Sequence, residues 1–89
     1  MAYEFEFDEI KSQVNLKKHG IDFVAAQALW LDDHLIEVPA RTEGEPRFLV
    51  VGVIADRHWS AIVTCRGERI RLVSVRRARA TEVAVYEDG

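Results

Sequence analysis

The 89-residue sequence contains one cysteine, Cys65, and two prolines, and it has no long apolar run. A single cysteine excludes an internal disulfide and favours a reducing compartment. No stretch approaches the roughly 20 apolar residues of a membrane-spanning helix, and the polar opening MAYEFEFDE does not resemble a signal peptide. We therefore expect residues 1–89 to form one cytoplasmic domain that does not contact a membrane.

The motifs of cofactor and metal sites are also missing. There is no glycine-rich phosphate loop, and the three histidines and the cysteine lack the spacing of metal ligands. The sequence therefore predicts neither a metal nor a cofactor, which argues against a metabolic enzyme that acts on small substrates. His34 and His58 match no motif, and we expect both in solvated turns.

Lysine is absent from residues 57–79, which contain seven arginines and a single acidic residue, Glu68. The preceding residues 1–56 are acidic, with eleven Asp/Glu against five Lys/Arg. Arginine can bind carboxylate and phosphate groups through two parallel hydrogen bonds. The arginine block thus predicts a phosphate-binding surface, although the solvated face of a strand and its turn would have the same composition.

Local patterns predict the order of secondary structure. The expected elements are a strand at 3–7, helices at 9–19 and 23–30, strands at 35–38, 47–54, 60–65 and 69–76, and a helix at 78–87, with loops or turns at 40–46, 55–59 and 66–68. Asp8 and Asp22 can cap the first two helices, and Gly20 can end the first. This order predicts an α+β domain with a mainly antiparallel sheet, two N-terminal helices and one C-terminal helix, in which the helices cover one face of the sheet.

The strand expected at 69–76 alternates apolar and basic residues. Strict alternation places Arg71 and Arg76 on opposite faces of the sheet, so they would not reach the same phosphate. A bend near Val75 or Arg76 would remove this objection. We expect Arg76 to be exposed.

The first helix has a polar stripe. At about 100° per residue, one side of this helix carries Lys11, Asn15, Lys18 and His19. Ile10 and Val14 lie beside the stripe, and we expect them to face the core. Such a stripe could bind a phosphate or the edge of a base. The alternative is a solvated helix face whose cations interact with the helix dipole.

Four segments resemble the signature of a known family. The first is F-E-F-D-x-x-K-x-x-x-N-L-x-K-H-G-I-x-F (5–23), and the second is E-x-R-F (45–48) with Gly52 after it. The third is T-x-R-G-x-x-I-R (64–71), and the fourth is S-x-R-R-A-x-x-x-E-x-x-x-Y-E (74–87). In this order and spacing the chain resembles the BrnT-type toxins of bacterial type II toxin–antitoxin modules.

The resemblance implies a small RelE-like domain and an activity. Proteins of this kind are small ribonucleases that stop translation by cutting RNA, so the chain would be a metal-independent endoribonuclease with RNA as its substrate. Its partner would be a cognate BrnA-like antitoxin of ribbon-helix-helix type. The antitoxin would neutralise the toxin and bind operator DNA, which the toxin would meet only indirectly. The alternative is a catalytically inactive module that binds RNA or protein on the same fold.

Metal-free RNA cleavage needs a base for the 2′-hydroxyl, donors for the phosphate and an acid for the leaving 5′-oxygen. Arginine supplies donors, imidazole exchanges protons near neutral pH, and a carboxylate can act as a base. The candidate catalytic residues are His19, Arg66, Arg71, Arg76 and Glu82, and the candidate RNA contacts are Lys11, Asn15, Lys18 and Arg77. Alternatively, His19 bonds the last helical carbonyls and Glu82 serves the dipole of the last helix.

Overall fold

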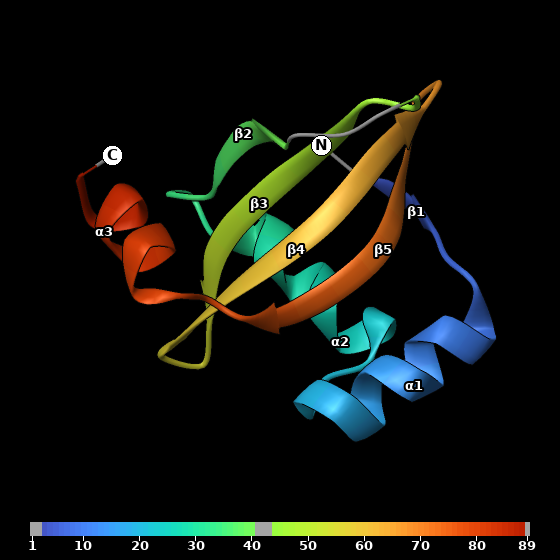
Figure 1. Ribbon diagram of the computed structural model, residues 1–89, viewed down its shortest axis with the longest axis horizontal. Coiled ribbons are helices and arrows are strands. Elements are labelled where there is room, and N and C mark those ends of the chain that lie inside the picture. Colours follow the sequence, from blue (N-terminus) through green and yellow to red (C-terminus); the bar gives the residue numbers. More distant parts are fainter. Residues whose placement is uncertain (1–2, 41–43, 89) are drawn as a thin grey trace.

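The computed structural model describes residues 3–40 and 44–88, and these form one five-stranded sheet with helices around it (Figure 1). The elements in chain order are β1 (Glu4–Glu6), α1 (Glu9–His19), α2 (Phe23–Ala26), the 3-10 helix η1 (Gln27–Leu31), β2 (Ile36–Ala40), β3 (Arg47–Ile54), β4 (Arg57–Arg66), β5 (Arg69–Arg77) and α3 (Ala80–Asp88). The strand order is β1-β5-β4-β3-β2, with β1 parallel to β5 and the other pairs antiparallel. The predicted α+β class and element order are confirmed.

The ends of α1 follow from local sequence. The Asp8 carboxylate accepts hydrogen bonds from the backbone N–H groups of Ile10 and Lys11, at 2.8 and 3.2 Å. Gly20 adopts a left-handed conformation with φ 80°, and its N–H donates to the Leu16 carbonyl at 2.9 Å. The predicted helix over 9–19 is therefore confirmed with both of its caps.

Three expected boundaries are wrong. The helix expected at 23–30 is α-helical only to Ala26 and then tightens into η1. β2 continues through Pro39, which an edge strand tolerates because one side of its backbone needs no partner. Ala55 and Asp56 form the β3–β4 turn with φ of 49° and 67°, so β4 begins earlier than expected, at Arg57. Residues 41–43 of the expected loop lie outside the described residues.

The hydrophobic core lies between the sheet and the N-terminal helices. It consists of buried side chains from the α1–η1 region and from one face of β3, β4 and β5: Ile21, Phe23, Ala26, Leu29, Val50, Trp59, Ala61, Val63, Leu72 and Val75. We call this face of the sheet the inner face. The opposite face, which carries Ser60, Ile62 and Thr64 of β4, is the outer face.

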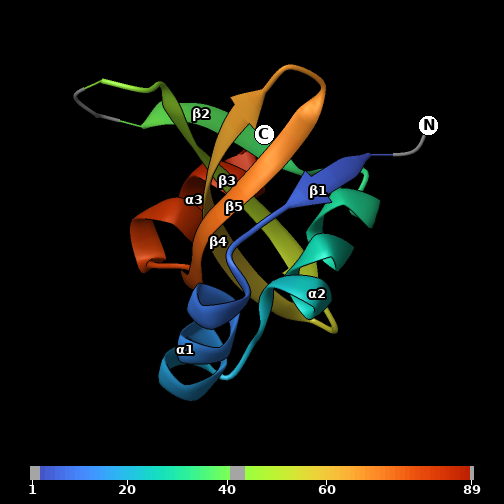
Figure 2. The same cartoon turned by 90° about the vertical axis from the view of Figure 1, so that its right-hand side faces the viewer.

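The C-terminal helix lies on the outer face. Figure 2 shows α2 and α3 on opposite sides of the sheet. The hydroxyl of Ser60 donates to Glu82 of α3 at 2.8 Å, and the hydroxyl of Tyr86 donates to Asp32 at 2.7 Å. The expectation that all helices cover one face is therefore wrong. No residue of α3 is buried, and these polar contacts help to hold it on the sheet.

α1 packs through polar rather than apolar side chains. Ser12 and Asn15 are buried, whereas Ile10 and Val14 are 76% and 47% exposed, so the expectation that Ile10 and Val14 face the core is wrong. The Asn15 amide donates to the carbonyls of Ile21 and Val75 at 2.8 and 2.9 Å and accepts from the Val75 N–H at 3.1 Å. One side chain thus satisfies both backbone groups that Val75 presents at the edge of β5.

Candidate functional site

An irregularity in β5 decides which side chains share the outer face. Ile62 of β4 pairs with Ser74, but the next residue, Val63, pairs with Leu72, so Val73 is an extra residue in β5. This β-bulge reverses the alternation of the strand. Arg71 and Arg76 consequently lie on the same face, and the expectation of opposite faces is wrong because the sequence pattern does not reveal the bulge.

Ser74 lies between these two arginines. Across β4, Arg71 is opposite Thr64, Ser74 is opposite Ile62 and Arg76 is opposite Ser60. Each arginine is therefore two β4 residues from Ser74, or about 7 Å at the usual rise of a strand. An extended arginine side chain covers a comparable length, so both guanidinium groups are within reach of a ligand above Ser74.

A groove runs between α1 and β5 beside Ser74. Its volume is ≈ 220 Å³, and it is lined by Lys11, Val14, Asn15, Lys18, His19, Val73 and Ser74. The four residues of the predicted helix stripe therefore meet in one groove. Ser74 belongs both to this groove and to the outer face, so the groove opens toward the side that carries Arg71 and Arg76.

The side chains that line the groove differ in whether they already have hydrogen-bond partners. Both amide hydrogens of Asn15 are bonded to backbone carbonyls. Asn15 is therefore corrected from an RNA contact to a residue that joins α1 to β5. The side chains of Lys11, Lys18 and His19 are exposed and make no hydrogen bond or ion pair with the described residues 3–40 and 44–88. The alternative in which His19 bonds the last carbonyls is not observed.

Arg76 is held by Glu82 in a bidentate ion pair. Nη1 and Nη2 of Arg76 donate to the two carboxylate oxygens at 2.7 and 2.8 Å, and the backbone N–H of Arg79 donates to the same carboxylate at 2.8 Å. The hydrogen bonds from Arg76 lower the pKa of Glu82 from 4.5 to about 2, and the bonds from Arg79 and Ser60 add to this effect. The pair in turn raises the pKa of Arg76.

This geometry changes the role expected for Glu82. A carboxylate with such a low pKa is a weak base at neutral pH. Glu82 instead fixes the guanidinium of Arg76 and reaches back to the N–H that precedes α3, as the third residue of a capping box does. We therefore treat Glu82 as a positioning residue.

The low pKa of Glu82 predicts a loss of stability in acid. Because the folded pKa lies below the ordinary 4.5, the carboxylate stabilises the fold above pH 4.5, and this contribution is lost between pH 4.5 and about 2. Across that window the wild type should lose about 2 kcal/mol more unfolding free energy than Glu82→Gln. Chemical denaturation at several pH values measures this, with the exposed Glu68→Gln as the control. Equal losses in wild type and Glu82→Gln would contradict the prediction.

Arg66 and Arg77 do not join this site. Arg66 lies six β4 residues from Ser60, the partner of Arg76, which is about 20 Å along the strand. Arg77 is paired with Trp59 on the inner side, and its guanidinium lies 5.5 Å from the centre of the indole ring. The expectation that these two arginines act together with Arg76 is therefore corrected.

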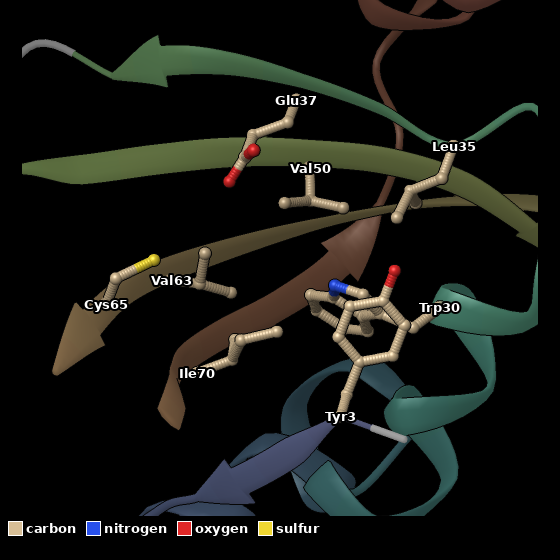
Figure 3. A pocket seen from close by; sticks show the side chains of 8 residues that line it. All are labelled: Tyr3, Trp30, Leu35, Glu37, Val50, Val63, Cys65 and Ile70. Atoms are coloured by element: carbon tan, nitrogen blue, oxygen red, sulfur yellow. The ribbon is translucent and has the colours of Figure 1, made fainter. Parts of the chain in front are cut away.

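A second pocket lies elsewhere. It has a volume of ≈ 300 Å³ on the inner face and is lined by Tyr3, Trp30, Leu35, Glu37, Val50, Val63, Cys65 and Ile70 (Figure 3). Its lining is mostly apolar and includes no arginine or lysine. It shares no residue with the groove between α1 and β5, so we leave it outside the candidate site.

Two strand residues of the site were missed by sequence reasoning. Ser74 is one residue of a matched segment, and Ser60 matches no motif. No local signal marks the bulge that places Ser74, because Val73 is an ordinary strand residue. His34 lies in an exposed turn, as expected. The same expectation is wrong for His58, which lies in β4 with its Nε2 3.1 Å from Glu87 Oε1.

Within the described ranges 3–40 and 44–88, no helix is long and apolar enough to cross a membrane. Over the same ranges, no group of three or more His, Cys, Asp and Glu side chains is placed to hold a metal ion. The site contains a groove with exposed lysines and an imidazole, beside two arginines. These groups are typical of a protein that binds phosphate esters.

Comparison with known families agrees with this class. The family model of the BrnT ribonuclease toxin of type II toxin–antitoxin systems matches residues 7–82. The chain therefore belongs to the BrnT ribonuclease toxin family, which confirms the resemblance. A comparison with curated proteins finds no significant match. Membership implies an RNA substrate and a cognate antitoxin.

Proposed function

We propose that this chain is a metal-independent endoribonuclease that cuts RNA at the groove between α1 and β5 and thereby inhibits translation. The observation that carries the proposal is the bulge at Val73. It places Ser74 between Arg71 and Arg76 on one face, next to the exposed Lys18 and His19 of α1. The phosphate to be cut would lie above Ser74.

The proposed reaction uses the RNA's own nucleophile. The 2′-oxygen forms a bond to the adjacent phosphorus while the bond from phosphorus to the 5′-oxygen breaks, leaving a 2′,3′-cyclic phosphate and a 5′-hydroxyl. The 2′-hydroxyl loses a proton and the 5′-oxygen gains one. Imidazole is the side chain best suited to general acid–base catalysis, and His19 is the histidine among the residues that line the groove, so we assign it one of these two transfers.

The arginines would stabilise the charge that builds on the phosphate. Arg71 and Arg76 approach from the two sides of Ser74, and guanidinium groups remain charged throughout. Glu82 keeps Arg76 in place before RNA arrives. A donor that needs no reorganisation is worth more in the transition state than one that must first be ordered.

Expression in bacteria without a partner tests this function. The wild type should arrest growth and leave cellular RNA cut, whereas a catalytically inactive module on the same fold would do neither. The matched control is Lys17→Ala, since Lys17 lies on α1 but does not line the groove. Normal growth with intact RNA, at good soluble expression of the wild type, would favour the inactive module.

The partner is proposed to be a ribbon-helix-helix antitoxin, encoded directly downstream, that contacts operator DNA itself. α1 offers a surface for it. Ile10 and Val14 form an exposed apolar pair, and at about 100° per residue this pair lies between Lys17 on one side and Lys11 and Lys18 on the other. An acidic, amphipathic segment of the antitoxin has the chemistry that fits this surface.

Such docking would also block RNA, because Val14 itself lines the groove. The toxin variant Ile10→Ser, co-expressed with the protein of the adjacent reading frame, should keep its toxicity but escape neutralisation. Leu31→Ser is the matched control, since Leu31 is 83% exposed on η1, away from α1. Full neutralisation of Ile10→Ser would contradict docking on α1.

A further inference from the structure

A second group of arginines lies on the outer face, at the end of the β4–β5 hairpin. Two rows of residues cross strands β1, β5 and β4 in register. The first row is Glu6, Arg71 and Thr64, and the second is Glu4, Arg69 and Arg66. The acidic strand β1 therefore places its carboxylates directly beside the basic strand β5.

Glu6 is shared by the arginines of both rows, but none of them holds it closely. Its carboxylate oxygens lie 3.9 Å from Arg66 Nε, 3.8 Å from Arg69 Nη1 and 3.7 Å from Arg71 Nη1. These separations are too long for hydrogen bonds. The backbone pairing of β1 with β5 fixes the position of Glu6. Two further carboxylates lie at the edge of the group: Glu45 Oε2 is 3.5 Å from Arg66 Nη2, and Glu4 Oε2 is 3.8 Å from Arg69 Nε. Glu6 is thus the carboxylate shared by all three arginines, and it neutralises them without satisfying their donors.

Thr64 supplies an independent observation. It is 2% exposed, and its Oγ1 has no hydrogen-bond partner within the described residues 3–40 and 44–88. A buried hydroxyl without a partner is costly and rare in folded proteins. Because Thr64 pairs with Arg71 across the sheet, its side chain is on the same face as that arginine.

We propose that Thr64, Arg66, Arg69 and Arg71 form a second phosphate subsite, which binds a backbone phosphate of RNA next to the one that is cut. Glu6 occupies this subsite in the free protein. A phosphodiester can approach the guanidinium groups to hydrogen-bond distance and can accept from the Thr64 hydroxyl, which the anchored carboxylate of Glu6 does not do. The choice of RNA as the ligand rests on the proposed function.

The position of the subsite suits a continuous RNA strand. The row of Thr64 and Arg71 is two β4 residues from the row of Ile62 and Ser74, which is about 7 Å. Arg71 would therefore lie between the phosphate above Ser74 and the phosphate in the subsite. Glu6 competes with the second of these, so removing its charge should strengthen RNA binding.

Binding of a 2′-O-methyl oligoribonucleotide tests the subsite without cleavage, because this probe lacks the attacking hydroxyl. Glu6→Gln should bind it about fivefold more tightly than the wild type, because the Glu6 carboxylate no longer competes with the phosphate for the arginines. Its salt dependence should steepen by about 0.7 in log–log slope, since one more phosphate is neutralised. Glu4→Gln is the comparison in the same strand and should have a smaller effect, because Glu4 is more exposed and, within the described part of the chain, pairs with just one of the three arginines, Arg69, at 3.8 Å.

A second variant keeps the proposal testable if Glu6→Gln affects folding. Thr64→Val removes the hydroxyl at nearly constant volume, so it should keep or raise stability while weakening binding of the probe severalfold. Wild-type affinity and salt slope in Glu6→Gln, or unchanged affinity in Thr64→Val, would overturn the subsite. These readouts do not depend on catalysis, so an absence of RNA cleavage by the wild type would count against the proposed function alone.

Discussion

Replacing Arg76 with alanine is expected to slow RNA cleavage by about 100-fold or more, the usual cost of losing one donor to a developing oxyanion. Arg76 is two β4 residues from the position above Ser74, and Glu82 holds its guanidinium by two hydrogen bonds of 2.7 and 2.8 Å. No other outer-face arginine has a comparable hydrogen-bonded support in the described part of the chain. Single-turnover cleavage of a short RNA measures the loss.

The same substitution should lower stability, contrary to what an exposed arginine predicts. The Arg76 side chain is only 26% exposed, and its partner Glu82 is 12% exposed. Removing the arginine leaves a mostly buried carboxylate with fewer donors, at a cost of about 1–3 kcal/mol. A fall in stability alone would therefore be an ambiguous explanation of lost activity.

The double variant Arg76→Ala with Glu82→Gln separates the two effects. Glutamine removes the uncompensated charge, so the double variant should recover part of the stability that Arg76→Ala loses. Cleavage should stay at the level of the single variant. If cleavage returns together with stability, Arg76 only supports the fold and the proposed phosphate contact is wrong.

Replacing His19 with glutamine is expected to lower cleavage by about 100-fold or more and to remove one limb of the pH–rate profile, as loss of a proton carrier does. Stability should stay close to that of the wild type, because the His19 side chain makes no hydrogen bond within the described residues and Gly20 closes the helix. Binding of the uncleavable probe should be retained. A lower melting temperature with an unchanged pH profile would assign His19 to the helix end.

Lys18→Ala should show a different pattern in the same assays. As a phosphate contact, Lys18 contributes to affinity, and its loss should reduce the salt slope of binding by about 0.7. The limiting rate at saturating RNA and the shape of the pH profile should change little. Lys17→Ala, on the side of α1 away from the groove, should leave both binding and rate unchanged.

The features that were predictable from sequence depend on neighbouring residues. Asp8 and Gly20 cap α1 through bonds within one helical turn, and β3 was predicted at its observed bounds because a continuous apolar run needs no distant information. The stripe of Lys11, Lys18 and His19 also followed from helical spacing alone. Local chemistry therefore supplied the half of the groove that α1 contributes.

The other half of the groove depends on pairing between distant segments. The bulge at Val73 is visible only in the register of β5 against β4, and no glycine marks it. The orientation of α1 likewise follows from Asn15 bonding Val75, a contact across 60 residues. Helical periodicity alone predicted that Ile10 and Val14 face the core, because an apolar pair on a helix normally does.

The acidic block and the arginine block were both recognised in the sequence, but their arrangement in space was not. Parallel pairing of β1 with β5 brings Glu4 and Glu6 beside the arginines, so part of the basic block is neutralised within the molecule. Composition cannot reveal a pairing between the first strand and the last. The arginines therefore divide between a supported site at Arg76 and a group around Glu6, where sequence reasoning expected one surface.

The most direct test of the account is cleavage of a defined RNA by the purified chain in the presence of a metal chelator, with the product ends identified. We expect a 2′,3′-cyclic phosphate and a 5′-hydroxyl at an undiminished rate, and a loss of about 100-fold in both His19→Gln and Arg76→Ala. Activity that the chelator abolishes, or that both variants retain in full, would contradict it.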